Sequence, residues 1–345
     1  MIGIGIDIGS TAAKAAVVDG EGSVAWTCVQ PTGFSSVDAS ERLREALAAA
    51  GYDVTADDVR VIATGYGRVA VPYAHKVVTE ITCHGTGAVR LFGDHGTVID
   101  VGGQDTKVIQ LKSGRVAKFA MNDKCAAGTG RFLEIMADRL GISQQQMADL
   151  ARSGEPTKIS NMCTVFAESE VISLIGRGEP RENIARGVID SVVSRVATMA
   201  GQAAGAPYYL TGGLCENTFV VERLGELLGS PVITSPQARF AGAIGAAVRA
   251  AALAWGCTAT CASSISRHKN QIALAAAPTL PRSYASRSRR GIAPPCFAAR
   301  HREIPKASWT GVLPCLPYRS SRPSCRFPSV VCPMSCPIPP HAIVT

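Results

Sequence analysis

Two cysteines precede predicted helices in this chain, and their thiolates are candidate metal ligands. Cys125 lies within residues 122–134, and Cys163 lies within residues 161–171. The positive end of a helix dipole favours the thiolate, which is the form of cysteine that binds metal. Two thiolates do not complete a four-thiolate iron–sulfur site, whereas two from each of two subunits do. The pattern therefore predicts a cluster shared by two copies of the chain.

A second chemical pattern occurs twice, because Asp7 and Asp100 each end an apolar run and precede a glycine-rich turn. Glycine lets backbone N–H groups approach phosphate oxygens, and an Asp can hold Mg²⁺ through water. A single Asp-x-Gly turn is weak evidence, since most such turns are ordinary hairpins. Two copies in phase with a later Thr-Gly-Gly turn at residues 211–213 favour a nucleotide site that grips the phosphates from both sides.

The elements that position these residues also repeat. Apolar periodicity and turn residues predict strand, turn and strand around each Asp, followed by helices. No P-loop sequence occurs, and no Gly-x-Gly-x-x-Gly opens a helix after a strand. The predicted strands cover residues 2–8, 13–18, 24–29, 59–63, 97–101, 106–111, 115–119, 208–210 and 232–233. The predicted helices cover residues 36–50, 80–92, 128–140, 165–175, 181–204 and 242–254, with one more before the last strand.

These residues resemble a known family, the ATP-dependent activators of 2-hydroxyacyl-CoA dehydratases, which are relatives of the ATPase subunits of benzoyl-CoA reductase. The resemblance runs from Ile2 to Ala254. It implies an α/β fold of the type shared by actin, heat-shock chaperone ATPases and sugar kinases (ASKHA), with two ribonuclease-H-like lobes around a nucleotide cleft. Its most specific segments are residues 63–68, 122–134 and 163–172, and residues 211–217 and 235–245 also match.

The resemblance implies an ATPase that donates single electrons. In that family a homodimer holds one [4Fe–4S] cluster through two cysteines from each subunit, and these match Cys125 and Cys163. ATP binding and hydrolysis, with Mg²⁺, swing the helices that end at the cluster and send one electron to the dehydratase. A ferredoxin or flavodoxin is the electron donor implied by the same analogy.

Site residues are carried over only where this sequence matches the family pattern. The family often has Gln at the position of Glu216, so this chain departs from the pattern there. The candidate catalytic residues are Asp7, Asp100 and Gln104. The candidate phosphate-side ligands are Ser10, Thr11, Ala12, Ala13, Lys14, Gly102 and Gly103. The candidate purine- and ribose-side ligands are Glu134, Gly212, Gly213, Glu216 and Gln237.

The composition changes near Gly256. Residues 1–256 hold 23 Lys and Arg against 26 Asp and Glu, a net charge of −3, whereas residues 257–345 hold 12 against 1, a net charge of +11. The second segment also has 13 of the 20 prolines and 7 of the 12 cysteines. We expect one lobe at residues 1–94, a second lobe with the cluster-binding helices at residues 95–256, and a disordered tail at residues 257–345. We interpret that tail as a shifted reading frame or a misjoined sequence.

Cysteine usage and hydropathy favour a cytoplasmic protein, because disulfide-framework spacing, a signal peptide and a membrane-spanning stretch are all absent. We read Cys28, Cys83 and Cys215 as small hydrophobes, and His75 and His84 as structural or exposed.

Alternative functions are an ATPase subunit of a benzoyl-CoA-reductase-type complex and a non-redox ASKHA nucleotide-sensing interaction protein. Nucleic-acid binding through the +11 tail is disfavoured, since aromatic stacking pairs and a docking helix are missing.

Overall fold

The structure, a computed structural model, describes residues 1–160, 163–203 and 205–254. All of these residues belong to one compact unit, Met1–Ala276. The predicted tail at residues 257–345 lies outside the described residues, so its expected disorder stays a prediction. Within the described residues, no helix has the length and apolar character needed to cross a membrane.

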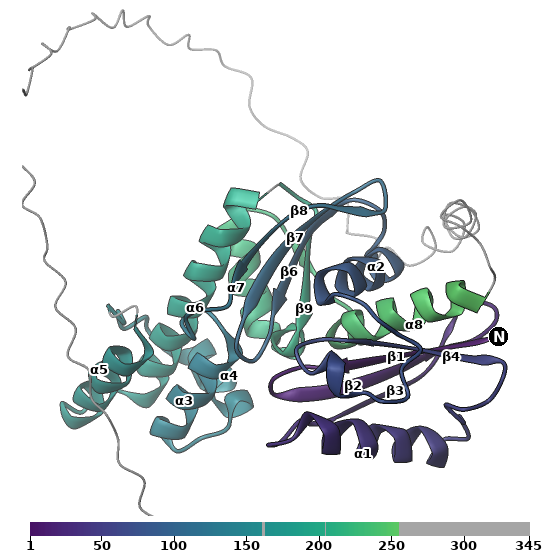
Figure 1. Cartoon of the computed structure of the whole chain (residues 1–345). Coiled ribbons are helices and arrows are strands. Elements are labelled where there is room, and N and C mark those ends of the chain that lie inside the picture. Colours follow the sequence, from purple (N-terminus) through teal and green to yellow (C-terminus); the bar gives the residue numbers. More distant parts are fainter. Residues whose placement is uncertain (161–162, 204, 255–345) are drawn as a thin grey trace, which may run out of the picture. The chain divides into compact units, whose positions relative to one another are not determined.

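The first sheet confirms the predicted strand, turn and strand at the N-terminus. Its strand order is β3-β2-β1-β4-β5 (Figure 1). Strand β2 pairs antiparallel with both β1 and β3, β4 pairs parallel with β1, and β5 pairs parallel with β4. One face packs on α1 (Ser36–Ala49), whose Leu43 and Leu47 are buried against Ile4 and Ile6. The strands are β1 (Ile2–Ile8), β2 (Ala12–Val18), β3 (Val24–Pro31), β4 (Val59–Thr64) and β5 (Lys76–Val77).

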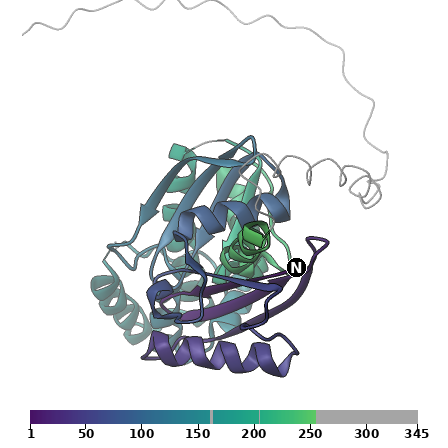
Figure 2. The same cartoon turned by 45° about the vertical axis from the view of Figure 1, so that its right-hand side comes forward.

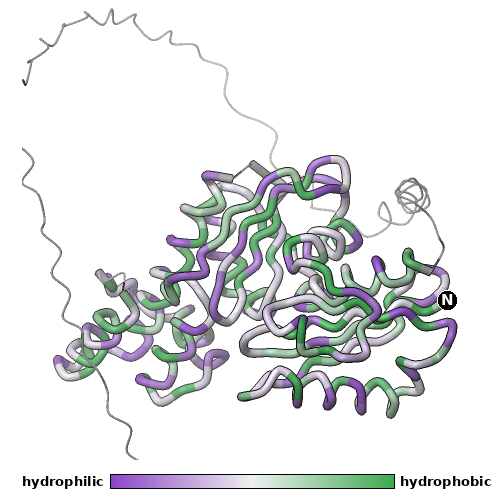
Figure 3. Tube along the Cα trace, in the orientation of Figure 1, coloured by the Kyte–Doolittle hydropathy of each residue, from purple (hydrophilic) through white to green (hydrophobic). Residues whose placement is uncertain are grey.

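The second sheet has the same topology as the first. Its order is β10-β9-β6-β7-β8, with β6, β7 and β8 antiparallel and β9 and β10 joined in parallel to β6. Hydrophobic residues are frequent along the central strands of both sheets (Figure 3), as expected for the buried β1 and β6, whereas the outer strands β3 and β8 are only partly covered. The strands are β6 (Gly96–Val101), β7 (Thr106–Lys112), β8 (Arg115–Asn122), β9 (Tyr208–Gly212) and β10 (Val232–Ile233).

Two helices lie between the sheets and pack on each other, namely α2 (Glu80–Phe92) and α8 (Ala241–Ala254) (Figures 1 and 2). Helix α8 follows the second sheet in sequence but packs on β1 of the first. Glycine makes the contact between the helices close, because a Cβ at Gly245 would lie 1.7 Å from the carbonyl oxygen of Cys83. The two halves are therefore joined through this helix pair, and the boundary predicted at residues 94–95 stays a prediction.

The remaining helices cover the second sheet and extend beside it. The long helix α6 packs on β6, β7 and β8 and on α4 and α7. Helix α4 was not predicted from the sequence, although Ser143 and Gln146 form a capping box, which is a sequence signal for the start of a helix. The helices are α3 (Gly130–Leu140), α4 (Gln144–Ser153), α5 (Thr164–Gly176), α6 (Arg181–Ala203) and α7 (Thr218–Leu228), with short 3₁₀ turns η1 (Arg68–Ala70), η2 (Gly213–Glu216) and η3 (Ala238–Phe240).

Candidate nucleotide site and cysteine loops

Each sheet presents one buried Asp at the end of its first strand. Asp7 is 7% exposed and Asp100 is 4% exposed. In both sheets the Asp pairs with a Lys on the antiparallel neighbour and with a Thr on the parallel neighbour. The strand pairing therefore builds the same three-residue set twice. The two sets are Asp7, Lys14 and Thr64 in the first sheet, and Asp100, Lys107 and Thr211 in the second.

The residue after each Thr is a glycine that the site requires. Gly65 has a φ of +85° and Gly212 has a φ of +81°. A Cβ would stand 2.4 Å from Asp7 Oδ1 at Gly65, and 2.7 Å from Asp100 Oδ1 at Gly212. Both the backbone conformation and the space beside the carboxylate therefore exclude a side chain. The glycine after β4 is a second copy of the predicted adenosine-side Gly212.

The two glycine-rich loops meet. A Cβ at Gly103 would lie only 2.1 Å from Thr11 Oγ1, so the second loop touches the first. Each loop closes with an equivalent backbone hydrogen bond, in which Gly9 N donates to Ala12 O at 3.1 Å and Gly102 N donates to Asp105 O at 2.9 Å. The structure thus brings the predicted phosphate-side residues of both sheets together.

The two lysines of the repeated sets differ in their surroundings. Lys107 is 2% exposed, and its Nζ lies 2.7 Å from Asp105 Oδ2, 2.8 Å from Glu80 Oε1 and 3.5 Å from Asp100 Oδ2. Burial opposes the charge of Lys107, but these carboxylates raise its pKa above the ordinary value. Lys14 is half-buried, and no ion pair joins it to another described residue. The charge of Lys14 is therefore available to a phosphate, whereas that of Lys107 is already neutralised.

The two aspartates differ in pKa. Burial alone would raise the pKa of Asp100, but the neighbouring His84, Lys107 and Lys14 hold it at about 2. Burial raises the pKa of Asp7 above its ordinary value, and the charge of Lys14 only partly opposes this effect. Asp100 is therefore ionised at neutral pH before any cation arrives.

His84 belongs to this centre, although the sequence analysis assigned it a structural or exposed position. It is 5% exposed on α2, and its Nε2 lies 2.8 Å from Thr211 Oγ1 and 3.5 Å from Asp100 Oδ1. Burial lowers the pKa of His84, and the nearby Asp100 carboxylate opposes this effect. No local sequence signal links His84 or Glu80 to Asp100, because helix packing rather than sequence spacing brings them together. Thr211, which His84 contacts, lies on a strand more than a hundred residues later. His75 is structural, since its Nδ1 accepts from Val61 N at 3.0 Å.

The predicted purine-side residues gather at the end of β9, with the exception of Glu134. Gly213 begins η2, Glu216 ends it, and Gln237 immediately precedes η3, which contacts η2. Both carboxylate oxygens of Glu216 accept from Arg239 Nη1, at 2.8 and 2.9 Å. Glu134 lies on α3 and accepts from Arg131 at 2.8 Å.

Four further predicted residues lie in or beside the first and second loops. Ser10 and Ala12 are half-buried at the turn between β1 and β2, while the side chain of Ala13 is buried in the core. Ala13 can therefore offer a ligand only its backbone. Gln104 is exposed in the second loop.

Cys125 and Cys163 are both exposed, and the structure corrects the expected position of Cys125. Cys163 is the N-cap of α5, as predicted. Helix α3 begins at Gly130 rather than near residue 128, with Thr129 as its N-cap, so Cys125 lies in the preceding loop. Cys163 therefore directly adjoins the first turn of its helix, whereas Cys125 does not.

The other described cysteines behave as the sequence analysis predicted. Cys28 is half-buried, while Cys83 and Cys215 are buried, and burial raises the pKa of the latter two thiols to about 11 each. Among the described residues, no group of three His, Cys, Asp or Glu side chains forms a metal site. A single copy of this part of the chain thus offers two exposed thiols and no complete ligand set.

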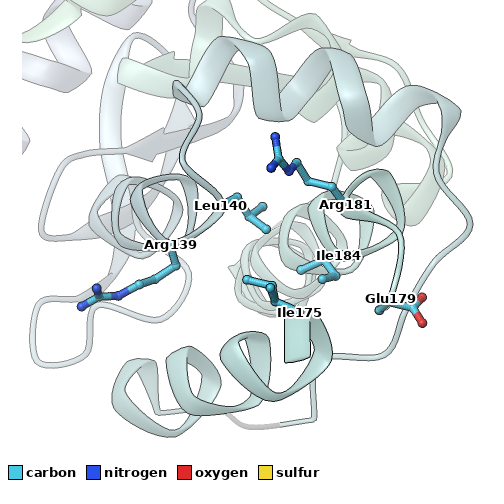
Figure 4. Close-up of a pocket in the computed structure, with 6 residues that line it drawn as sticks. All are labelled: Arg139, Leu140, Ile175, Glu179, Arg181 and Ile184. Carbon is cyan, nitrogen blue, oxygen red and sulfur yellow. The ribbon is translucent and has the colours of Figure 1, made fainter. Parts of the chain in front are cut away.

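Helix α5 leaves apolar side chains uncovered beyond Cys163. Val165 is 66% exposed, Phe166 63%, Ile172 52% and Ile175 44%. A pocket of about 240 Å³ lies where α3, α5 and α6 meet, and it contains none of the candidate site residues. Figure 4 shows its apolar side chains near the centre, with the charged groups of Arg139 and Glu179 pointing away from it.

Comparison with known proteins identifies the family. The sequence model of the BadF/BadG/BcrA/BcrD ATPase family matches residues 4–250. The (R)-2-hydroxyglutaryl-CoA dehydratase activating ATPase of Acidaminococcus fermentans is 42% identical over 251 residues, which cover 72% of this chain and 96% of the relative.

Two solved structures resemble this one throughout their length. Component A of the (R)-2-hydroxyglutaryl-CoA dehydratase of Acidaminococcus fermentans superposes with a TM-score of 0.70 at 38% identity, covering 74% of this chain and 99% of its own. The activator of the 2-hydroxyisocaproyl-CoA dehydratase from Clostridium difficile, with bound ADPNP, has a TM-score of 0.69 at 33% identity, covering 74% and 96%. The chain therefore belongs to the BadF/BadG/BcrA/BcrD ATPase family and has the ASKHA fold of actin, heat-shock chaperone ATPases and sugar kinases.

Proposed function

We propose that this protein is an ATP-dependent activator of a 2-hydroxyacyl-CoA dehydratase, and that it donates single electrons through a [4Fe–4S] cluster bridging a homodimer. The observation that carries the proposal is the pair of exposed cysteines, Cys125 and Cys163, in a chain whose duplicated Asp-Gly loops meet. Its relatives named as activating ATPases and dehydratase activators support the same conclusion.

The nucleotide part of the proposal uses both loops. Backbone N–H groups around Ser10 and Thr11, and those of Gly102 and Gly103, cradle the phosphates, while Lys14 adds a positive charge. Asp7 and Asp100 orient Mg²⁺ through its water ligands, because small, hard Mg²⁺ retains several waters. Exposed Gln104 orients the attacking water, a role that Gln has in other nucleotide hydrolases. A solved relative with bound ADPNP supports nucleotide binding.

The adenosine part of the proposal lies at the end of β9. Gly212 and Gly213 offer bare backbone, so the nucleoside can approach closely. We assign the purine and ribose contacts to Glu216, Gln237 and Glu134. Because Arg239 already neutralises Glu216, the pair presents hydrogen-bonding groups with little net charge.

The cluster part of the proposal rests on the donor set. Cys125 and Cys163 are exposed thiols, and the remaining described cysteines are at least half-buried. Two copies of the chain supply the four thiolates that a [4Fe–4S] cluster needs, and the cluster then supplies one-electron chemistry. The amides of the first turn of α5 favour the charged form of Cys163.

The protein partners in this proposal are a second copy, a dehydratase and an electron donor. Exposed apolar side chains such as Val165 and Phe166, beside Cys163, favour contact with another protein surface. The donor is a ferredoxin or flavodoxin, and the setting is the cytoplasm.

Anaerobic purification of the full chain tests the proposal. We expect about four irons per two chains, a brown colour, ATPase activity, and dehydratase activation by the wild-type protein. Cys125→Ala or Cys163→Ala should abolish the cluster and the activation but spare ATP binding, while Cys83→Ala and Cys215→Ala should leave iron content unchanged. Full iron content in either of the first two variants would contradict the bridging cluster.

The same purification separates the alternatives. A colourless protein with ATPase activity would favour a non-redox nucleotide-sensing role. A stable heteromer that co-purifies with its acceptor would favour a benzoyl-CoA-reductase-type subunit, whereas an activator dissociates from its dehydratase.

A further inference from the structure

The loop that carries Cys125 is built onto the second phosphate loop. Thr106 follows that loop as the first residue of β7, and it pairs with Asn122, the last residue of β8. The side chain of Asn122 then donates to two carbonyl groups of the cysteine loop, to Cys125 O at 2.9 Å and to Ala127 O at 3.1 Å. One side chain thus ties the backbone of Cys125 to the strand pair that ends at the phosphate loop.

The far end of the cysteine loop is tied to the same strand. The buried Thr106 Oγ1 donates to Gly128 O at 2.6 Å. Thr129 Oγ1 donates back to Ala126 O at 2.7 Å, within the loop itself. Gly128 has a φ of +85°, which lets the chain turn into α3 at this point. The segment from Asn122 to Thr129 is therefore held at both ends by the residues that follow the phosphate loop.

The helix after the cysteine loop is bonded to the phosphate loop directly. Gly130 N donates to Gly102 O at 2.9 Å, and Arg131 N donates to Gly103 O at 2.8 Å. These carbonyl groups belong to the glycines assigned to nucleotide binding, and Gly103 also touches Thr11 across the site. A shift of Gly102 and Gly103 with nucleotide state must therefore move the start of α3 and the loop before it.

Cys163 is reached less directly. Its helix α5 packs on α3 and α6, and Glu168 of α5 forms an ion pair with Arg139 of α3. Among the described residues, the hydrogen bonds include none between α5 and either phosphate loop. Motion at the phosphates therefore reaches α5 through the packing of α3 and α6 rather than through a hydrogen bond to the phosphate loops.

We propose that the bound nucleotide changes the position of Cys125 directly, with Asn122 as the positioning residue that links the two. The position of Cys163 changes only indirectly. The inference rests on the proposed function and adds to it a route and an asymmetry between the two thiols. In each subunit the thiol of Cys125 moves with the nucleotide state, and the thiol of Cys163 moves less.

Thiol labelling of the cluster-free, reduced full chain tests this proposal without electron transfer. The protein is treated with iodoacetamide alone, with Mg·ADP, and with Mg·ADPNP, and the labelling rates of Cys125 and Cys163 are measured by mass spectrometry of their peptides. We expect the rate at Cys125 to change about fivefold or more between nucleotide states, the lower range of ordinary coupling between sites, and to exceed the change at Cys163.

Two variants separate the hydrogen bonds from the bulk of the side chain. Asn122→Asp keeps the shape but has no N–H to donate, and Asn122→Ala removes the group. Both should reduce the nucleotide dependence at Cys125 to less than about twofold while nucleotide affinity stays near that of the wild type. Asn217→Ala is the matched control, because Asn217 caps α7 through Val220 N and should leave the dependence intact.

The outcomes distinguish this proposal from the proposed function. If the wild-type protein binds neither nucleotide, the proposed function is wrong. If it binds both but Cys125 labels equally in all states, or Cys163 responds more strongly, the coupling route is wrong. Full nucleotide dependence in Asn122→Asp would also overturn the role of Asn122.

Discussion

The centre of the site is one set of three residues used twice, and the two copies have diverged in charge. The carboxylates of Asp7 and Asp100 come from equivalent strand ends, yet only Lys107 is surrounded by carboxylates. The half-buried Lys14 faces the site without such partners among the described residues. The duplication therefore produces a lysine neutralised by carboxylates in one half and, in the other, the lysine that we propose as a phosphate ligand.

At this scale we expect Asp7→Asn or Asp100→Asn to reduce ATP turnover by about a hundredfold or more, because each removes a charge that organises Mg²⁺. Steady-state phosphate release measures the effect. The dimer and its iron content should persist, since both residues lie away from the cysteine loops. Normal rates in both variants would rule out the assignment.

The two lysines provide a matched pair. Lys14→Met should raise the KM for ATP at least about tenfold, as expected for a lost charged contact of 1.4 kcal/mol or more, with little change in thermal stability. Lys107→Met leaves Glu80, Asp100 and Asp105 without their cation, so it should cost about 3–5 kcal/mol of unfolding free energy. Urea titration and ATPase kinetics of both variants check the contrast. Equal loss of stability in the two variants would contradict it.

At the scale of elements, α2 and α8 join the two sheets, and both reach the aspartates. His84 of α2 lies beside Asp100, while a Cβ at Gly242 of α8 would lie 2.5 Å from Asp7 Oδ2. Glycine at the crossing of the helices allows this approach, since side chains there would separate them. The packing of this helix pair therefore helps to position the two candidate catalytic carboxylates.

We expect Gly245→Ala to lower the unfolding free energy by about 1–3 kcal/mol, because the new Cβ would overlap the carbonyl of Cys83. Thermal and urea denaturation measure the loss. Gly201→Ala on α6 is the control, since nothing lies within 4 Å of its Cβ, and it should be neutral or slightly stabilising. An unchanged stability of Gly245→Ala would show that the helices can move apart freely.

At the scale of the whole molecule, the amino-acid composition changes sharply near Gly256. Residues 257–345 carry a net charge of +11 and 13 of the 20 prolines. From this composition alone we expect the segment to bury too little apolar surface to offset its ordering entropy. The family match, which ends at residue 250, leaves it aside.

Truncation after Gly256 should therefore leave ATPase activity, cluster content and dimer mass unchanged. Those three measurements on the truncated and full-length chains are the check. A cooperative unfolding transition of residues 257–345 alone, or loss of activity on truncation, would count against this expectation.

The sequence by itself determined those helices, strands and candidate site residues that leave a local pattern in the sequence. Alternation and helical period are local, so the strands around Asp7 and Asp100 and the helix at Glu80–Phe92 were predicted at or near their observed bounds. The roles proposed for Cys125 and Cys163 also rest on local motifs and stay predictions. The start of α3 was predicted slightly early, because cap residues shift a boundary without changing the apolar period. Helix α4 and the two-residue strand β5 were not predicted at all.

Only the tertiary structure decided which charges meet. The register of β6 with β9 places Thr211 beside Asp100, and helix packing adds His84 and Glu80 to the same centre. A side chain that finds its partner a hundred residues away leaves no periodic signal, since burial and pairing energies depend on the folded neighbours rather than on sequence spacing. The link between the cysteine loop and the phosphate loop was likewise visible only in the structure, because it depends on the pairing of β7 with β8 and on the bonds from Gly130 and Arg131 to Gly102 and Gly103.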